Sequence, residues 1–334
     1  MRSSRLLRVG LAVVALGFLG YGLAANWSAT AAALGRLSWG TVAGAVAAVL
    51  AGVGCMLVAW RAVLAGLGSP LPLRVAAKVM CLGQLGKYVP GSVWAFAAMM
   101  ELARDHGSPP RRTFGATVIA LVTSLGCALG LAAATLPFTS REVAGRAWYL
   151  LALVPLIVVC LHPRVLTFGL NLLLRIARRE PLERVLPGRA MLTAGAWTLA
   201  GWLLYGVHVW LLLREMRPGG AALFAVAAGA YALAWATGLL TVIVPAGIGV
   251  REGAMVLVLA PVLDAPRALV IAVVSRLAFT LADLVWAGLG FALARGTPRW
   301  TARPPTPPRK PEAPSSAGRH HASAASSCAA YPAQ

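Results

Sequence analysis

The stretch "LGQLGKYVPGSVW" at residues 82–94 decides the fold, because it breaks an otherwise apolar region with a lysine and a Pro-Gly pair. Proline removes a hydrogen bond inside a helix, and a charged side chain is costly at membrane depth. A second break, "VIVPAGIGVREGAMVLV" at residues 242–258, contains a proline, three glycines and an Arg–Glu pair. The two halves of the chain therefore each contain a helix break and charged residues within an apolar segment, at matching positions.

The composition is that of a membrane protein. Hydrophobic residues make up 59% of the 334 residues and charged residues 12%, which is about half the charged fraction of soluble domains. Several apolar runs are long enough for the roughly 20 residues that cross a bilayer core. The net charge is +20, and the basic residues flank the apolar runs on alternate sides, as the positive-inside rule describes. No compact basic domain accompanies them, so nucleic acid is excluded as a partner.

We expect an all-α polytopic fold with about six full transmembrane helices and two broken, re-entrant hairpins. The N-terminal apolar run is read as an uncleaved first span, because its small residues match a signal-peptidase site poorly. Residues 1–296 form the transmembrane domain, and the Pro-, Ser-, Ala- and Arg-rich residues 297–334 are predicted to be a disordered cytoplasmic tail. The six full spans are expected at residues 6–25, 38–60, 113–136, 146–161, 190–213 and 268–294.

The first break lies in a region too short to cross the membrane twice. Residues 75–103 number 29, or about 43 Å of helix, and basic residues flank both ends. This favours a re-entrant hairpin that enters from the cytoplasmic side. The second region, 221–262, is read as a hairpin from the opposite side, because that topology leaves more basic residues inside. A full span over 221–244 stays open as the alternative.

The two halves then share one plan in opposite orientations. Each consists of a span, a broken hairpin and a second span. Inverted-topology repeats of secondary transporters have this plan, and their discontinuous helices build the substrate site near the membrane midplane. We therefore infer an inverted repeat.

The first break supplies a candidate anion site. Lys87 at membrane depth requires a partner or a polar cavity, and the helix that starts after Gly91 offers unpaired N–H groups. A lysine beside a helix start suits a phosphate. The alternative is that Lys87 reaches the cytoplasmic interface and Trp94 only fills space. The candidate residues here are Lys87, Tyr88, Pro90, Gly91 and Trp94.

The second break supplies charges of both signs. Arg251 has three candidate partners, which are Glu252, Asp283 and an anionic substrate, whereas Glu252 also suits a helix start. Arg276 and Asp283 are seven residues apart and share one helix face. For Arg276, a structural pair with Glu252 and a role in substrate passage both stay open. The candidate residues here are Pro245, Gly247, Gly249, Arg251, Glu252, Arg276 and Asp283.

Two other features have structural interpretations. His208 lies within a span and is expected to be a hydrogen-bond partner between helices. Residues 162–189 place arginines among leucines, which fits either a helix lying on anionic headgroups of the inner leaflet or an ordinary basic loop.

Soluble-enzyme signatures are absent from the sequence. The chain has no GxxxxGK[ST], HExxH or GxSxG motif and no paired-cysteine metal spacing. We therefore expect no enzymatic activity, no catalytic residue, no cofactor and no metal site.

The motifs support a family resemblance. "GKYVPGSVW", "ELARDHG", "VPAGIGVREGAM" and "SRLAFTLADLVWAGLG" resemble the membrane domain of bacterial lysylphosphatidylglycerol synthases and of stand-alone flippase-like membrane proteins. The resemblance covers about residues 5–295. It implies a stand-alone member without the soluble synthase domain. It also implies a domain that moves a lipid or lipid-linked precursor between leaflets, with the twelve candidate residues above matching the two motifs and the following span.

Two functions are carried forward, and a membrane-embedded enzyme that acts on lipid phosphate, with Glu252 and Asp283 as its acid–base pair, stays open as a third. The first is translocation, in the bacterial inner membrane with both termini cytoplasmic, of an anionic or aminoacylated phospholipid or a polyprenyl-linked precursor. Its phosphate headgroup would bind in a polar cavity between the hairpins. The alternative is a non-transporting accessory subunit of a lipid- or glycan-modifying partner enzyme. The sequence leaves open the cargo, the direction, the energy source and the oligomeric state.

Overall fold

The computed structural model describes residues 27–88, 94–135, 153–176, 181, 185–241 and 249–295, and the structural statements below refer to them. This part of the chain is helical and contains no strand, which confirms the all-α fold. The predicted tail at 297–334 and the predicted first span at 6–25 lie outside it. The α-helices are α2 (Trp27–Leu34), α3 (Trp39–Gly66), α4 (Leu73–Gln84), α5 (Trp94–Arg104), α6 (Pro110–Thr135), α9 (Leu153–Cys160), α10 (Pro163–Ile176), α11 (Gly188–Met216), α12 (Ala221–Leu240), α13 (Val250–Leu259) and α14 (Ala265–Arg295), and the 3-10 helix η1 is Leu85–Tyr88.

Five of the described helices are long and apolar enough to cross a membrane. They are α3, α6, α11, α12 and α14. Four of these agree with predicted spans, at 38–60, 113–136, 190–213 and 268–294. Of the predicted span at 146–161 the structure describes residues 153–161, and α9 covers eight of them. The chain is therefore a polytopic membrane protein.

Local sequence signals set the helix boundaries. Ser38 caps α3, because its hydroxyl accepts a hydrogen bond from the Thr41 amide at 3.1 Å. Gly68, with φ of 85°, follows the end of that helix. Pro110 occupies the first position of α6, where its missing N–H costs nothing. The Asp264 carboxylate accepts from the Arg267 amide at 3.0 Å and so caps α14.

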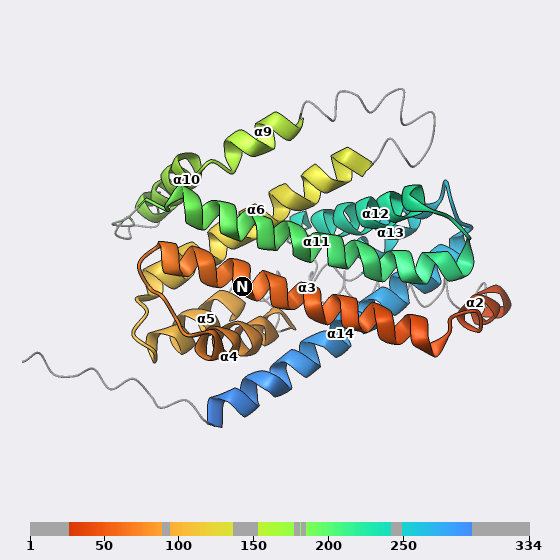
Figure 1. Cartoon of the computed structure of the whole chain (residues 1–334), viewed down its shortest axis with the longest axis horizontal. Coiled ribbons are helices and arrows are strands. Elements are labelled where there is room, and N and C mark those ends of the chain that lie inside the picture. The colour runs from red at the N-terminus through yellow and green to blue at the C-terminus, as the bar shows by residue number, and fades with distance from the viewer. Residues whose placement is uncertain are drawn as a thin grey trace, which may run out of the picture. The chain divides into compact units, whose positions relative to one another are not determined.

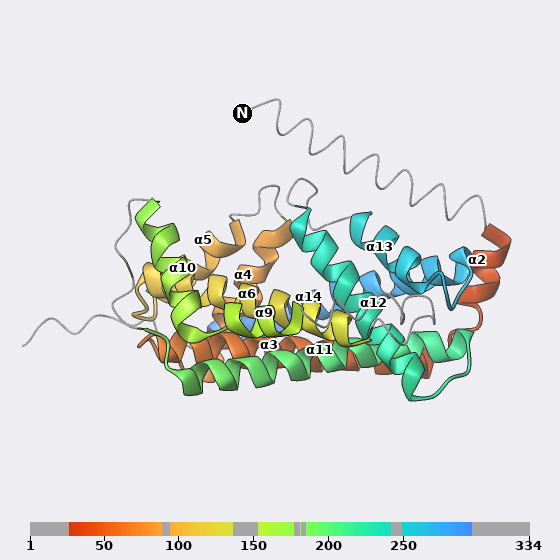
Figure 2. The same cartoon turned by 90° about the horizontal axis from the view of Figure 1, so that it is seen from above.

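The two hairpins enter the bundle from opposite ends. The first hairpin comprises α4, η1 and α5, and it starts at the end of the bundle where α3 ends, which we call the first end (Figures 1 and 2). The second hairpin comprises α12 and α13, and it starts at the second end, where α11 ends. α12 stops near the mid-length of α11, and α13 returns to the second end. This arrangement agrees with the favoured hairpin, although α12 alone has the length of a span.

Contacts between helices follow the symmetry of an inverted repeat. The first unit is α3, the first hairpin and α6, and the second is α11, the second hairpin and α14. α6 packs against α12 just as α14 packs against α4, and α3 and α11 pack extensively against each other. α5 contacts α6 as α13 contacts α14. Equivalent helices run in opposite directions (Figure 1), so the packing supports the inferred inverted repeat.

The first end is fixed by basic side chains. Arg61 Nε donates to the Leu71 carbonyl at 2.7 Å, and Arg112 Nη1 donates to the Gly68 carbonyl at 2.9 Å. Lys78 Nζ lies 3.2 Å from His106 Nε2 and links α4 to the turn after α5. Burial, together with the charge of Lys78, lowers the pKa of His106, so a neutral imidazole accepts this bond near neutral pH.

α3 and α11 cross where two glycines face each other. A Cβ added to Gly52 would lie 3.2 Å from the Gly201 carbonyl, and one added to Gly201 would lie 3.1 Å from the Gly52 carbonyl. The Tyr205 ring also packs directly on Gly52. Small residues allow such close backbone approach between membrane helices.

We predict that Gly52→Ala destabilises the protein by about 1–3 kcal/mol, because the new methyl group displaces Tyr205 and separates the helices. The matched control is Gly195→Ala on α11, where an added Cβ meets no atom within 4 Å. Both variants gain the helix propensity of alanine, so the difference isolates the packing effect. Thermal unfolding in detergent measures it. Equal midpoints for the two variants would contradict the crossing described.

Candidate functional site

The start of α13 positions the charged residues of the second break. Gly249 has φ of 83°, a conformation that favours glycine, and α13 begins at the next residue. Arg251 and Glu252 therefore lie in the first turn of a helix, and this turn faces α12 and α14.

Glu252 is a buried structural carboxylate, with a side chain 5% exposed. Its Oε2 accepts a hydrogen bond from the Gly249 amide at 2.6 Å, which satisfies one of the unpaired N–H groups at the helix start. Its Oε1 lies 3.6 Å from Arg276 Nη1 on α14. The structure thus forms the Arg276–Glu252 pair that the sequence left open, and this pair joins the second hairpin to the last long helix. Pairing here offsets the cost of burying two charges.

Arg251 is held by aromatic rings. Its guanidinium lies 4.7 Å from the centroid of the Tyr231 ring and 5.0 Å from that of Phe279, and Nη2 donates to the Tyr231 hydroxyl. Such cation–π contacts stabilise a cation without neutralising it. Among the described residues, no carboxylate forms an ion pair with Arg251. Of its three predicted partners, Glu252 and Asp283 are therefore not ion-paired to it.

An aromatic layer between α11, α12 and α14 supports this arginine. The Tyr231 and Phe279 rings stack at 5.2 Å, and the buried His208 ring meets Tyr231 edge-on at 4.7 Å. His208 Nε2 lies 2.9 Å from the Ser275 hydroxyl, which connects α11 to α14. The interpretation of His208 as a partner between helices is thereby confirmed.

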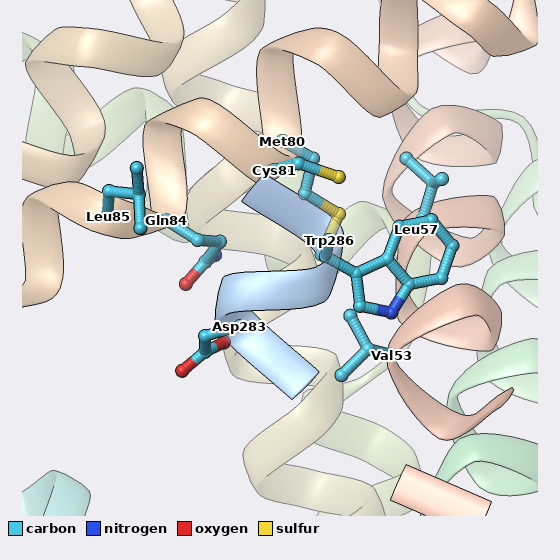
Figure 3. A pocket seen from close by; sticks show the side chains of 8 residues that line it. All are labelled: Val53, Leu57, Met80, Cys81, Gln84, Leu85, Asp283 and Trp286. Carbon is cyan, nitrogen blue, oxygen red and sulfur yellow. The ribbon is translucent and has the colours of Figure 1, made fainter. Parts of the chain in front are cut away.

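Asp283, unlike Arg251 and Arg276, lies beside the first hairpin. It borders a pocket with a volume of about 20 Å³, enough for one water molecule and too small for a phosphate headgroup. Figure 3 shows the polar ends of Asp283 and Gln84 directed toward the same side of this pocket. The pocket is lined by Val53 and Leu57 of α3, Met80, Cys81 and Gln84 of α4, Leu85 of η1, and Asp283 and Trp286 of α14.

α14 therefore brings one charge to each hairpin. Arg276 meets Glu252 of the second hairpin, whereas Asp283 faces α4 of the first. The shared helix face predicted for these two residues is consistent with this placement. Arg251 and Arg276 therefore contact residues of the second hairpin, and Asp283 borders the first.

Part of the predicted first site can be placed only by its backbone. Lys87 and Tyr88 lie in η1, which continues α4, and their side chains lie outside the described part. Trp94 begins α5, and its side chain is 55% exposed, so it does not fill a core space. The anion site at Lys87 stays a prediction. Outside the described residues also lie Pro90, Gly91, Pro245 and Gly247.

Tyr231, Phe279, Ser275 and Gln84 were not predicted as site residues. Phe279 lies three residues after Arg276 and four before Asp283, so the helix period places it on their face. Tyr231 is a single phenol in an alanine-rich segment, where a polar tip in the membrane calls for a partner. Both signals were available in the sequence.

Removing one partner of the Glu252–Arg276 pair should be costly. We predict that Glu252→Gln lowers the unfolding free energy by about 2–3 kcal/mol, because a partly buried guanidinium loses its carboxylate. A double-mutant cycle with Arg276→Gln isolates the pair, measured by denaturant unfolding in mixed micelles.

The matched control is the same cycle on Glu101 and Arg104, an ion pair whose side chains are 60% and 61% exposed. Exposed pairs of this kind couple weakly. A coupling energy between Glu252 and Arg276 no larger than that of the control pair would show that the buried pair does not hold the hairpin.

The comparison with known families covers both breaks. A sequence model of the family described as "Lysylphosphatidylglycerol synthase TM region" matches residues 5–287. No curated protein matched the chain. This family is a membrane domain related to lipid modification or translocation. The chain, a membrane protein with two opposed hairpins and a charged interior, therefore belongs to the lysylphosphatidylglycerol synthase TM region family.

Proposed function

We propose that this protein translocates an anionic phospholipid or a lipid-linked precursor across the bacterial inner membrane. The phosphate headgroup would bind between the tips of the two hairpins. Family membership and the hairpins that enter from opposite ends support this proposal. The observation that carries it is the positive charge of Arg251, held on two aromatic faces and ion-paired with no carboxylate among the described residues.

The chain keeps this charge available although a carboxylate is the next residue. The Glu252 carboxylate already binds the Gly249 amide and Arg276, and it forms no ion pair with Arg251. A purely structural arginine at this depth would be expected to pair with an acid. A guanidinium has five N–H donors, so Arg251, which donates to the Tyr231 hydroxyl, would keep donors for the bidentate contacts that phosphate oxygens accept.

The other candidate residues take supporting roles in the proposal. Lys87 would supply the second cation from the first hairpin, with Tyr88 and Trp94 beside the headgroup and Pro90 and Gly91 ending the half-helix. Asp283 would balance these cations or contact a cationic headgroup. The backbone N–H group of Gly247 would face the phosphate, whereas Pro245 and Gly249 would shape the break that presents Arg251.

The two halves of the bundle are packed unequally, which supports a transport mechanism by alternating access. Gly52 and Gly201 face each other, so the residues that follow them, Val53 and Trp202, occupy equivalent places. Trp202 packs on Trp235 of α12 at 5.0 Å, whereas Val53 borders the small pocket beside α4. The second hairpin is thus closely packed where the first leaves a gap. Transporters with inverted repeats change access by exchanging such packing between halves.

The distribution of charge supports a cytoplasmic first end. Basic residues are more numerous there than at the second end, as the positive-inside rule requires of the cytoplasmic side. Among the described residues, the first end carries Arg61, Arg74, Lys78, Arg104, Arg111, Arg112, Arg164, Arg175 and Arg189, and the second end carries Arg36, Arg214, Arg217 and Arg267.

Transport should depend on Arg251. In proteoliposomes that contain fluorescent phosphatidylglycerol, we expect Arg251→Gln to slow leaflet exchange at least about tenfold, the effect of losing one charged hydrogen bond. Arg251→Lys should be intermediate, because it keeps the charge and loses the planar fork that can bind two phosphate oxygens. The control is Arg74→Gln, which removes an exposed arginine at the first end. Dithionite quenching measures the exchange.

Two outcomes would count against the proposal. The first is exchange at the rate of protein-free vesicles for every anionic lipid tested with the unmodified protein. The second is equal exchange by Arg251→Gln and Arg74→Gln, which would separate transport from the aromatic-held charge and favour an accessory role.

A further inference from the structure

The helix α10 runs across the bundle instead of along it. It lies at the first end, at a steep angle to α3 and α11 (Figure 2). The sequence left open a surface helix or a basic loop over this region, and the structure shows 14 helical residues. Spanning helices stand upright in a bilayer, so a helix that crosses them at their end lies close to the membrane plane.

One face of α10 packs on the protein. Thr167, Leu170 and Leu174 are buried there, at positions i, i+3 and i+7. The Leu186 amide donates to the Thr167 hydroxyl at 3.4 Å, which holds the following segment against this face. α10 is therefore docked on the bundle through a defined surface.

The opposite face is apolar and exposed. Val165 and Leu172 are 42% and 48% exposed, and Phe168 and Ile176 are 71% and 73% exposed. These four side chains occupy positions i, i+3, i+7 and i+11, so they form one continuous strip. Among the described residues, nothing covers this strip. The preceding helix α9 continues the exposed apolar surface with Leu156 and Val159.

A narrow polar stripe lies between the buried and the exposed apolar faces. Arg164, Asn171 and Arg175 share it, at positions i, i+7 and i+11. Both arginines are exposed, and neither has an ion-pair partner within the part of the chain that the structure describes. When α10 lies in the membrane plane with its exposed apolar residues in contact with lipid, the polar stripe of Arg164, Asn171 and Arg175 faces the water.

We propose that α10 is a membrane-surface helix that binds anionic lipids. Val165, Phe168, Leu172 and Ile176 lie among the upper acyl chains, and Arg164 and Arg175 bind headgroup phosphates. Charge complementarity selects this occupant over a second copy of the chain or a partner protein. A protein partner would have to pair two arginines, whereas an anionic leaflet offers phosphates along the whole stripe. The site is separate from Arg251 and does not depend on transport.

The first experiment measures immersion. The five native cysteines are replaced, and nitroxides are attached in separate variants Phe168→Cys, Leu172→Cys, Arg164→Cys and Arg175→Cys. The full chain is reconstituted in vesicles of phosphatidylcholine and phosphatidylglycerol at 3:1. We expect labels at 168 and 172 to collide with oxygen and not with a water-soluble nickel chelate, and labels at 164 and 175 to show the reverse. Labels at 168 and 172 shielded from both reagents would mean a protein cover, and labels reached by the chelate would mean water. Either result overturns the proposal.

The second experiment measures lipid preference. Association of spin-labelled phosphatidylglycerol is compared with that of phosphatidylcholine, and the preference should fall about fivefold for each arginine replaced in Arg164→Gln and Arg175→Gln. Arg164→Lys with Arg175→Lys should keep it. The matched control is Arg267→Gln at the second end, whose side chain is 38% exposed. An unchanged preference in the double glutamine variant contradicts the proposal. Arg251→Gln should slow transport and leave label accessibility on α10 and the lipid preference unchanged. Failure of the transport proposal is therefore distinguishable from failure of the α10 proposal.

Discussion

One carboxylate, that of Glu252, joins the broken second hairpin to the last long helix. A broken helix inside a membrane leaves backbone groups and charges that no water can satisfy, so protein atoms have to satisfy them. Glu252 does this twice, because it accepts the Gly249 amide at the helix start and pairs with Arg276 of α14. The position of α13 follows from these two contacts. So does the availability of Arg251, whose sequence neighbour is already occupied.

The bundle around this carboxylate is symmetric in plan and unequal in detail. Opposed hairpins, a glycine crossing of α3 and α11, and the reciprocal contacts of α6 and α14 follow the repeat. Aromatic rings fill the interface of α11 and α12, whereas the corresponding place beside α4 keeps room for a water. Asp283 borders this pocket and Arg276 pairs with Glu252 of the second hairpin, so α14 contacts both hairpins. The proposed translocation would depend on exchange of these two unequal packings between the inferred repeats.

The sequence predicted the features that depend on charged, polar or proline residues placed within apolar segments. Four spans and the role of His208 were predicted, and the Glu252–Arg276 pair was one of two alternatives left open, because charges and polar side chains in apolar segments need partners. The aromatic support of Arg251 was not predicted. Its members Tyr231 and Phe279 come from two other helices, and which rings meet depends on helix rotation and crossing angle, which composition does not determine. Hairpin and span also look alike in α12, where length and hydropathy are equally compatible with both.

The positions of the helix ends impose a rule of parity on the connection between the repeats. A span, a hairpin and a span together make an even number of crossings, so each unit begins and ends on the same side. α6 nevertheless runs toward the second end, and α11 starts at the first (Figure 1). The connection must therefore traverse the bilayer an odd number of times, and that traverse alone turns the second unit upside down. A chain that lost it would place both hairpins on one side, and the fold would become a tandem of parallel units.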